Sequence, residues 1–347
     1  MQHRSQLTIR RSASLAVLAV MAVVNTGAAS AAEWRALVGA QSPDLGSQAL
    51  AFLPNEIWIH AGDSIRWTHA SNEIHTVTFL TPGQVRPPNS GPTFGVPVGC
   101  PGNTPDGAGF NGSSCVNSGI LGQGPVNLGP VIQTYSVSFP STGNFKLVCL
   151  VHADMTSTIH VLAPAAQLPH DQAFYDAEAV RQGAILVSET SSLRGFANSD
   201  DENAGNPPQV TTGQGAIVAT GAGSQTASLM RFLQDVLVVR VGDTVEWTNH
   251  DPTTPHTVTF GTEPADPRPA SLNVSSTSDG ARQTIISSIN ESANSGLLQA
   301  APQDRPGLAQ SPPGVTRFRV TFTAPGTFHY ICALHDDLGM KGTVIVQ

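Results

Sequence analysis

Charged residues, and lysine above all, are scarce in this sequence. Asp, Glu, Lys and Arg make up 12% of the 347 residues, and lysine occurs only at positions 146 and 341. The formal charge is −8, and it becomes −11 if the first 32 residues, with their three arginines and no acids, are removed. Such an acidic chain is a poor partner for nucleic acid or an anionic membrane surface, since both attract basic proteins.

Long apolar runs are also missing. The stretch Leu15–Val24 is shorter than the roughly 18 residues that a membrane span requires. It follows three arginines and precedes the small residues Ala29–Ala31, an order typical of a secretion signal. We therefore predict a signal peptide at residues 1–32 and a periplasmic or secreted mature protein without a membrane span.

Glycine and proline are abundant instead, with 33 and 26 residues, which favours short strands joined by many turns. Three blocks of alternating apolar residues occur twice, in the same order. The blocks are 52–68 and 232–248, 75–79 and 256–260, and 135–149 and 318–332. A repeat of this length indicates tandem domains rather than a solenoid.

The repeat predicts two all-β domains, at residues 33–163 and 183–347. Several short strands with frequent turns suit a Greek-key barrel or sandwich. The linker at 164–182 is predicted to be short and partly helical. Two long polar loops, at about 81–130 and 261–315, interrupt the repeats.

The chain has four cysteines, in two different settings. Cys100 and Cys115 lie in one loop rich in Gly, Pro and Asn, where an exported protein can form a disulfide. Cys149 and Cys332 instead end predicted strands in the two repeats.

Each of the latter cysteines begins a short cluster of possible metal ligands. The clusters read Cys-x2-His-x2-Met and Cys-x2-His-x4-Met, and a further histidine opens an earlier strand of each repeat. The residues are His75, Cys149, His152 and Met155, and His256, Cys332, His335 and Met340. Two imidazoles, one thiolate and a weak thioether form the ligand set of a blue-copper site. With one thiolate per cluster and a Met in place, structural zinc fits less well.

Both repeats resemble cupredoxins of the plastocyanin–amicyanin type. The first has the shorter ligand loop typical of amicyanin, and the second has plastocyanin-like spacing. The resemblance implies one type 1 copper per domain, held by the eight residues named above, and electron transfer with partner proteins. One departure is Thr76 or Thr257 after the first ligand, where plastocyanins often carry Asn.

Copper enzymes with tandem cupredoxin domains need a second copper centre held by additional histidines. The sequence contains no His-x-His, and no histidine adjoins Cys149 or Cys332. We therefore predict an electron carrier rather than an oxidase or nitrite reductase. The alternative is a periplasmic protein that holds or delivers copper, or an accessory subunit of a redox complex.

Overall fold

The computed structural model describes residues 31–84, 103–123, 131–152, 154–202, 217–223, 226–251, 254–299 and 315–347, with backbone alone at 191–202 and 217–223. Residues 1–30, almost all of the predicted signal peptide, lie outside these ranges, as do parts of both long loops. Among the described residues, no helix combines the length and apolar character that a membrane crossing requires.

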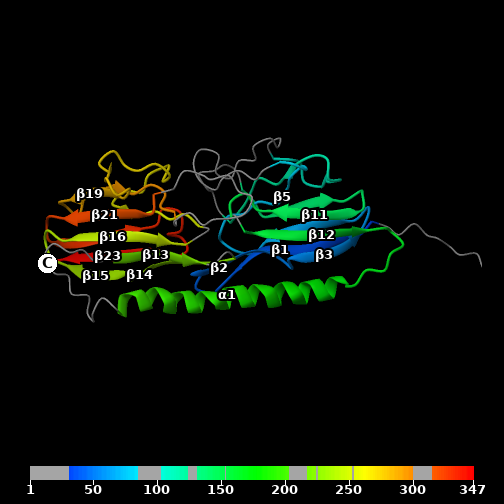
Figure 1. The fold of residues 1–347 in the computed structure, drawn as a ribbon, viewed down its shortest axis with the longest axis horizontal. Helices are drawn as coiled ribbons and strands as arrows, with labels where there is room; N and C mark the ends of the chain where they lie inside the picture. The colour runs from blue at the N-terminus through cyan, green and yellow to red at the C-terminus, as the bar shows by residue number, and fades with distance from the viewer. Residues whose placement is uncertain are drawn as a thin grey trace, which may run out of the picture. The chain divides into compact units, whose positions relative to one another are not determined.

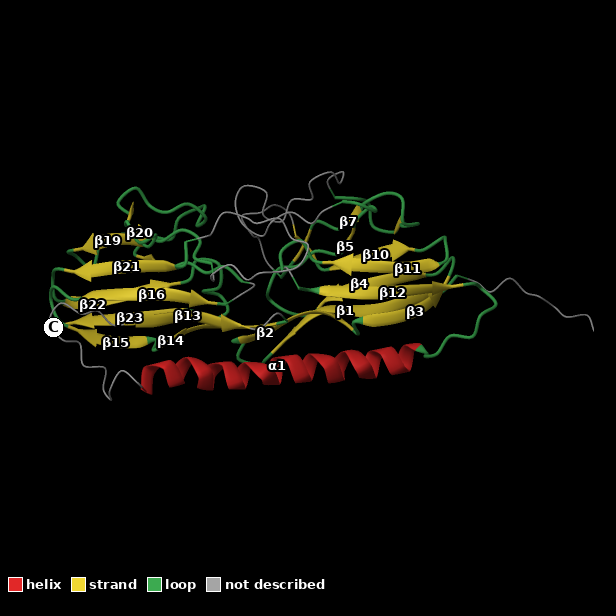
Figure 2. Cartoon of the chain, viewed as in Figure 1, coloured by secondary structure: helices red, strands yellow, loops and turns green. Residues whose placement is uncertain are grey.

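The first half of the chain is built from strands, as the sequence predicts (Figure 2). The strands are β1 (Glu33–Gln41), β2 (Ser47–Leu53), β3 (Glu56–His60), β4 (Ser64–His69), β5 (Thr78–Phe79), β6 (Ala108–Gly109), β7 (Val116–Asn117), β8 (Ile120–Leu121), β9 (Val131–Ile132), β10 (Thr134–Ser138), β11 (Gly143–Val148) and β12 (Thr156–Leu162).

The strands β3 and β4, which follow each other in sequence but lie in different sheets, show how the alternating pattern forms this fold. Ile57, Ile59 and Trp67 are buried, whereas Trp58, which points to the other face, is only partly covered. Between the strands Gly62 has a φ of 101°. Glycine reaches this left-handed region without the steric cost that a side chain brings, so the chain can turn tightly there.

Two packed sheets enclose the first core. One has the strand order β3-β12-β11-β5-β7, and the other contains β2, β1, β4, β10 and β6. Large aromatic residues fill the space between them: Trp67, Phe79, Tyr135 and Phe139. Neither sheet closes on itself, so the described strands form an open sandwich rather than a closed barrel.

The second half repeats this arrangement. Its strands are β13 (Ile217–Gly223), β14 (Ala227–Leu233), β15 (Val236–Val239), β16 (Thr244–His250), β17 (Thr259–Phe260), β18 (Ser275–Ser276), β19 (Arg282–Ile286), β20 (Ala293–Asn294), β21 (Arg317–Phe322), β22 (Gly326–Ile331) and β23 (Lys341–Val346). The order β15-β23-β22-β17-β20 matches β3-β12-β11-β5-β7, strand for strand. The sequence repeat is therefore a structural repeat.

One sheet runs through both halves. β14 pairs antiparallel with β2, with Ala227 opposite Ala49 and Leu229 opposite Ser47. This pairing joins the strands into an 11-stranded sheet. The sequence did not predict this continuity, because the pairing joins backbone groups and leaves no side-chain signal.

The helix α1 (Gln172–Glu202) confirms the helical character of the linker but is longer than predicted, with 31 residues. It begins after Asp171, whose Oδ1 accepts a hydrogen bond from the backbone N–H of Phe174. Tyr175 and Ala179 are buried on its inner face, and the helix packs along β1, β2 and β14 (Figure 1). This packing extends the helix beyond residue 182, since tertiary contacts stabilise helices more than local propensity does.

Candidate metal centres

The first cluster of possible ligands converges at one end of the first sandwich. His75 lies shortly before β5, Cys149 directly follows β11, and His152 lies in the loop before β12. The Nδ1 atoms of His75 and His152 are 3.2 Å apart, and Nδ1 of His152 is 3.8 Å from Sγ of Cys149. All three side chains are fully buried.

The second cluster has a similar geometry. Nδ1 of His256 and Nδ1 of His335 are again 3.2 Å apart. Sγ of Cys332 lies 3.3 Å from Nδ1 of His335 and 3.9 Å from Nδ1 of His256. In both halves the three donor atoms lie within 4.8 Å of one another.

Two ring nitrogens and a sulfur that face one another across a buried space are what a metal site requires. Each cluster offers one thiol and two imidazoles. These donors suit copper, whereas magnesium and calcium prefer ligand sets made of oxygen atoms. The residues present therefore fit a copper ion, and the fit is the same in both halves.

Met155 and Met340 close the two ligand loops. Both side chains are buried, in the same apolar clusters as Cys149 and Cys332 respectively. The backbone N–H of each cysteine donates to the carbonyl oxygen of its methionine, over 3.0 Å in both halves. The loops of unequal length therefore end in the same backbone contact.

The threonine that follows the first histidine of each cluster forms hydrogen bonds to the segment that carries the cysteine. The backbone N–H groups of Thr76 and Thr257 donate to Sγ of Cys149 and Cys332, over 3.4 and 3.3 Å. The Thr76 hydroxyl accepts a hydrogen bond from the backbone N–H of Leu150 at 2.8 Å. Threonine at this position thus fixes the cysteine strand by both its backbone and its side chain.

The surroundings favour ionised sulfur. Burial alone raises the pKa of the Cys149 thiol, but hydrogen bonds from His152 and His75 and their positive charge outweigh it, so that pKa lies well below its usual value. The pKa of the Cys332 thiol is lowered in the same way by His335 and His256. A thiol that readily loses its proton suits metal binding, because the thiolate is the ligand.

Glu73 is a site residue that the sequence did not reveal. Its carboxylate is buried, with Oε1 3.5 Å from Nε2 of His152 and Oε2 3.2 Å from Nε2 of His335. Burial alone raises the pKa of Glu73, but the charge of His335 and the contacts with both rings hold it well below its usual value. The one available signal was a break in the repeat, since Thr254 occupies the corresponding position.

The other two ligand histidines also have polar partners at Nε2. Oγ of Ser71 lies 3.2 Å from Nε2 of His75, and Oδ2 of Asp251 lies 3.5 Å from Nε2 of His256. Outer partners of this kind fix the orientation of a ligand ring and leave its other nitrogen for the metal. The sequence analysis did not identify either residue.

The predicted disulfide lies at the boundary of the described chain. Cys115 is disulfide-bonded, while Cys100 lies outside the described residues. Cys149 and Cys332 are not disulfide-bonded.

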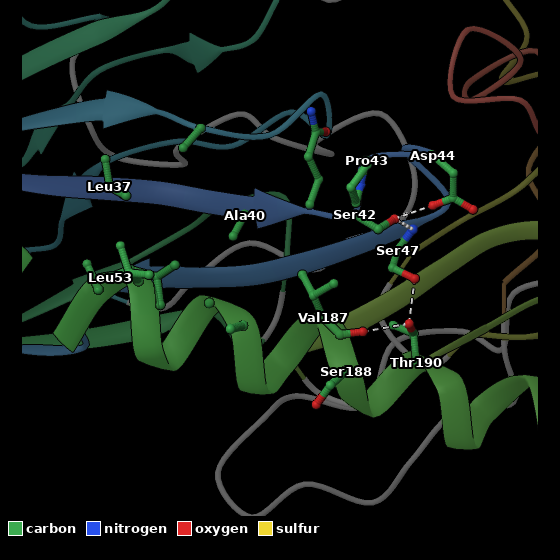
Figure 3. A pocket seen from close by; sticks show the side chains of 16 residues that line it. Leu37, Ala40, Ser42, Pro43, Asp44, Ser47, Leu53, Val187, Ser188 and Thr190 are labelled. Atoms are coloured by element: carbon green, nitrogen blue, oxygen red, sulfur yellow. Dashed lines mark hydrogen bonds between the residues drawn. The ribbon is translucent and has the colours of Figure 1, made fainter. Parts of the chain in front are cut away.

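A separate cavity of about 810 Å³ lies between α1 and the strands β1 and β2 (Figure 3). Its lining is mostly apolar, and Ser47 and Thr190 meet there through their hydroxyl groups. None of the lining residues is a histidine or cysteine. The metal-ligating chemistry of the described residues therefore lies outside this cavity.

Among solved structures, the chain is similar to amicyanin and plastocyanin. A Cu(I) form of an amicyanin variant is 19% identical, with 38% of this chain and 82% of that chain covered and a TM-score of 0.23. An oxidised amicyanin variant is 21% identical, with coverage of 40% and 87% and a TM-score of 0.23. Oxidised plastocyanin from Dryopteris crassirhizoma is 21% identical, with coverage of 38% and 100% and a TM-score of 0.22. Similarities at this level carry no conclusion about function.

No curated protein matches the sequence closely enough to report as a relative. Residues 218–347 match the family model described as copper binding proteins, plastocyanin/azurin family. The matched segment contains His256, Cys332 and His335, the three convergent donors of the second centre. The chain therefore carries a copper-binding domain of the plastocyanin/azurin family at residues 218–347.

Proposed function

We propose that this is an exported two-domain blue copper protein that binds one type 1 copper in each domain and transfers electrons between partner proteins. The observation that carries the proposal is the convergence of two Nδ1 atoms and one Sγ atom in each half. The family match supports copper at the second centre, and the repeated geometry extends the same chemistry to the first.

In each proposed centre a cysteine thiolate and two imidazoles bind the metal, and a methionine thioether completes the set. The proposed ligands are His75, Cys149, His152 and Met155, and His256, Cys332, His335 and Met340. Copper bound in such a site supplies one-electron chemistry by alternating between Cu(I) and Cu(II).

The protein's own part is to hold these donors rigidly and away from water. The histidines and cysteines come from different strands and loops of a packed sandwich, and all six are buried. The Thr76 and Thr257 N–H groups fix the sulfur atoms, and the Nε2 partners fix the rings. A donor set that cannot rearrange keeps the ligand geometry the same in both oxidation states.

The proposal includes the domain limits 33–163 and 183–347, and export through the signal peptide at 1–32. It assigns no catalytic site. With a methionine as fourth ligand, a type 1 centre has no open position for a substrate. In addition, the sequence lacks the His-x-His and His-Cys motifs by which multicopper oxidases and nitrite reductases hold further copper.

The test is metal analysis combined with visible absorption and electron paramagnetic resonance on protein loaded with Cu(II). Two coppers per chain, two type 1 signals and no type 2 signal are expected. Cys149→Ser should remove one blue centre and spare the other, and Cys332→Ser should do the reverse, so that each variant is the control for the other. One copper per chain, or a type 2 signal in the unaltered protein, would contradict the proposal.

Reversible cycling separates an electron carrier from a copper-delivery protein. A carrier should alternate between the blue and colourless forms many times while retaining both coppers. Loss of Cu(I) to a competing chelator within the first cycles would instead indicate delivery.

A further inference from the structure

The ligand loops of the two candidate centres meet at one side chain, Glu73. Its two oxygens face different centres, with Oε1 3.5 Å from Nε2 of His152 and Oε2 3.2 Å from Nε2 of His335. In both rings Nδ1 faces the cysteine of the same centre. Each imidazole therefore lies between its own donor set and the shared carboxylate.

This contact is sealed from solvent. Glu73 is 4% exposed, His152 is 0% exposed and His335 is 4% exposed. Burial of a carboxylate is costly unless it is paired, so Glu73 needs the two rings as partners. In a medium of low dielectric these polar contacts are also stronger than they are in water.

The first half of the protein holds Glu73 in place by its backbone. Its carbonyl oxygen accepts a hydrogen bond from Nε2 of His69 at 2.8 Å and another from Oγ of Ser71 at 3.4 Å. His75, a proposed ligand, follows two residues later in the same loop. Glu73 is thus anchored beside the first centre and reaches the second with its side chain.

The described part of the second half contains no counterpart of this arrangement. Thr254 takes the corresponding position in the repeat and meets Ser228 through its hydroxyl group. The carboxylate next to His256 comes instead from Asp251, at 3.5 Å. Glu73 therefore contacts a ligand histidine of each centre, whereas the Asp251 contact is with a ligand of its own centre.

We propose that Glu73 connects the two copper centres for electron exchange within the molecule, along the path His152–Glu73–His335. This inference rests on the proposed function. One electron passes from Cu(I) at one centre to Cu(II) at the other, so one copper is oxidised as the other is reduced, and no bond or proton has to move. An electron accepted from a partner at either centre can then leave at the other.

The test measures the rate of this exchange directly. In the fully oxidised, copper-loaded protein, pulse radiolysis reduces one copper per molecule, and absorption follows the redistribution of the electron between the centres. Spectra of Cys149→Ser and Cys332→Ser identify the two components. The redistribution rate should not depend on protein concentration, which shows that the exchange is intramolecular.

Glu73→Gln preserves the shape of the side chain, but its amide nitrogen cannot accept a hydrogen bond, so only one ring can keep its contact. The exchange rate, compared at the same difference in reduction potential between the two centres, should fall by about tenfold or more. Losses of this size are typical when an outer partner of a metal ligand is removed. Glu246→Gln is the control, because it neutralises a partly buried carboxylate whose partner is Arg319 rather than a residue of either centre. The exchange rate of this control should stay within about threefold of that of the unaltered protein, a smaller change than the tenfold loss expected for Glu73→Gln.

An unchanged rate in Glu73→Gln with both blue centres intact, or equal losses in the two variants, would overturn this inference and leave the proposed function standing. Absence of type 1 spectra in the unaltered protein would instead overturn the proposed function.

A second measurement needs no variant. In the Cu(I) protein, nuclear magnetic resonance should show Nε2 protons of His152 and His335 that exchange slowly with water. Fast exchange of either proton would also overturn the inference.

Discussion

At the scale of single residues, the threonine that follows the first candidate ligand histidine of each half stabilises the site through hydrogen bonds that the sequence does not reveal. Thr76 is fully buried, and its hydroxyl accepts the N–H of Leu150 and contacts the hydroxyl of Thr78 at 3.0 Å. Thr257 repeats the first contact with the N–H of Ala333. Threonine at this position, where plastocyanins often carry Asn, therefore links the segment of the first histidine to the segment of the cysteine.

Thr76→Val should destabilise the metal-free protein by about 1–3 kcal/mol, because the buried N–H of Leu150 loses its acceptor. Urea unfolding of the metal-free protein measures this change. Thr68→Val, at an exposed position of β4, is the control and should change stability by less than about 0.5 kcal/mol. Equal effects of the two substitutions would show that the hydroxyl contact is unimportant.

At the scale of secondary-structure elements, α1 is fastened to the edge strand β3 by Tyr175. The phenol oxygen accepts a hydrogen bond from the N–H of Trp58 at 2.9 Å and donates one to the carbonyl of Trp58 at 3.0 Å. The ring packs edge-on against Trp34. One side chain of the helix thus satisfies both backbone groups of a residue on an otherwise unpaired strand edge.

Tyr175→Phe keeps the packing but removes both hydrogen bonds. The unfolding free energy should fall by about 1–3 kcal/mol, since two partly buried backbone groups lose their partner. Chemical unfolding followed by circular dichroism measures this loss. Val180→Ala, at an exposed position of the same helix, serves as the control and should have little effect. An unchanged unfolding free energy in Tyr175→Phe would mean that water replaces the phenol hydroxyl at the strand edge.

At the scale of the whole molecule, the two sandwiches share more than a linker. β2 and β14 lie side by side in one sheet, and α1 packs against strands of both halves. Arg231 adds a further connection, since it donates hydrogen bonds to the carbonyl oxygens of Asp44 and Leu338. These contacts predict that the halves unfold together.

Calorimetry of Cys149→Ser, loaded with copper at its second centre, tests this cooperativity. A ligand that binds only the folded state stabilises it by about 4 kcal/mol at a free concentration of 1,000 times Kd. If the halves form one unit, a single transition should move to higher temperature as a whole. Two transitions, of which copper shifts one, would contradict the prediction.

Several features of this protein followed from the sequence alone. Its alternating apolar pattern predicted an all-β fold, because the two faces of a strand meet core and solvent in turn. The Cys-x2-His spacing shared by Cys149 and Cys332 predicted the two candidate ligand loops, because those donors are close along the chain. His75 and His256 could be added because each opens a matching block of the repeat.

Other features were decided only by the tertiary structure. The shared sheet depends on backbone edges, which have no side-chain pattern to read. The full length of α1 depends on the strands beneath it, beyond what its own residues favour. Glu73 looked like an ordinary loop glutamate, because the rings that it contacts belong to segments far along the chain and come together only on folding.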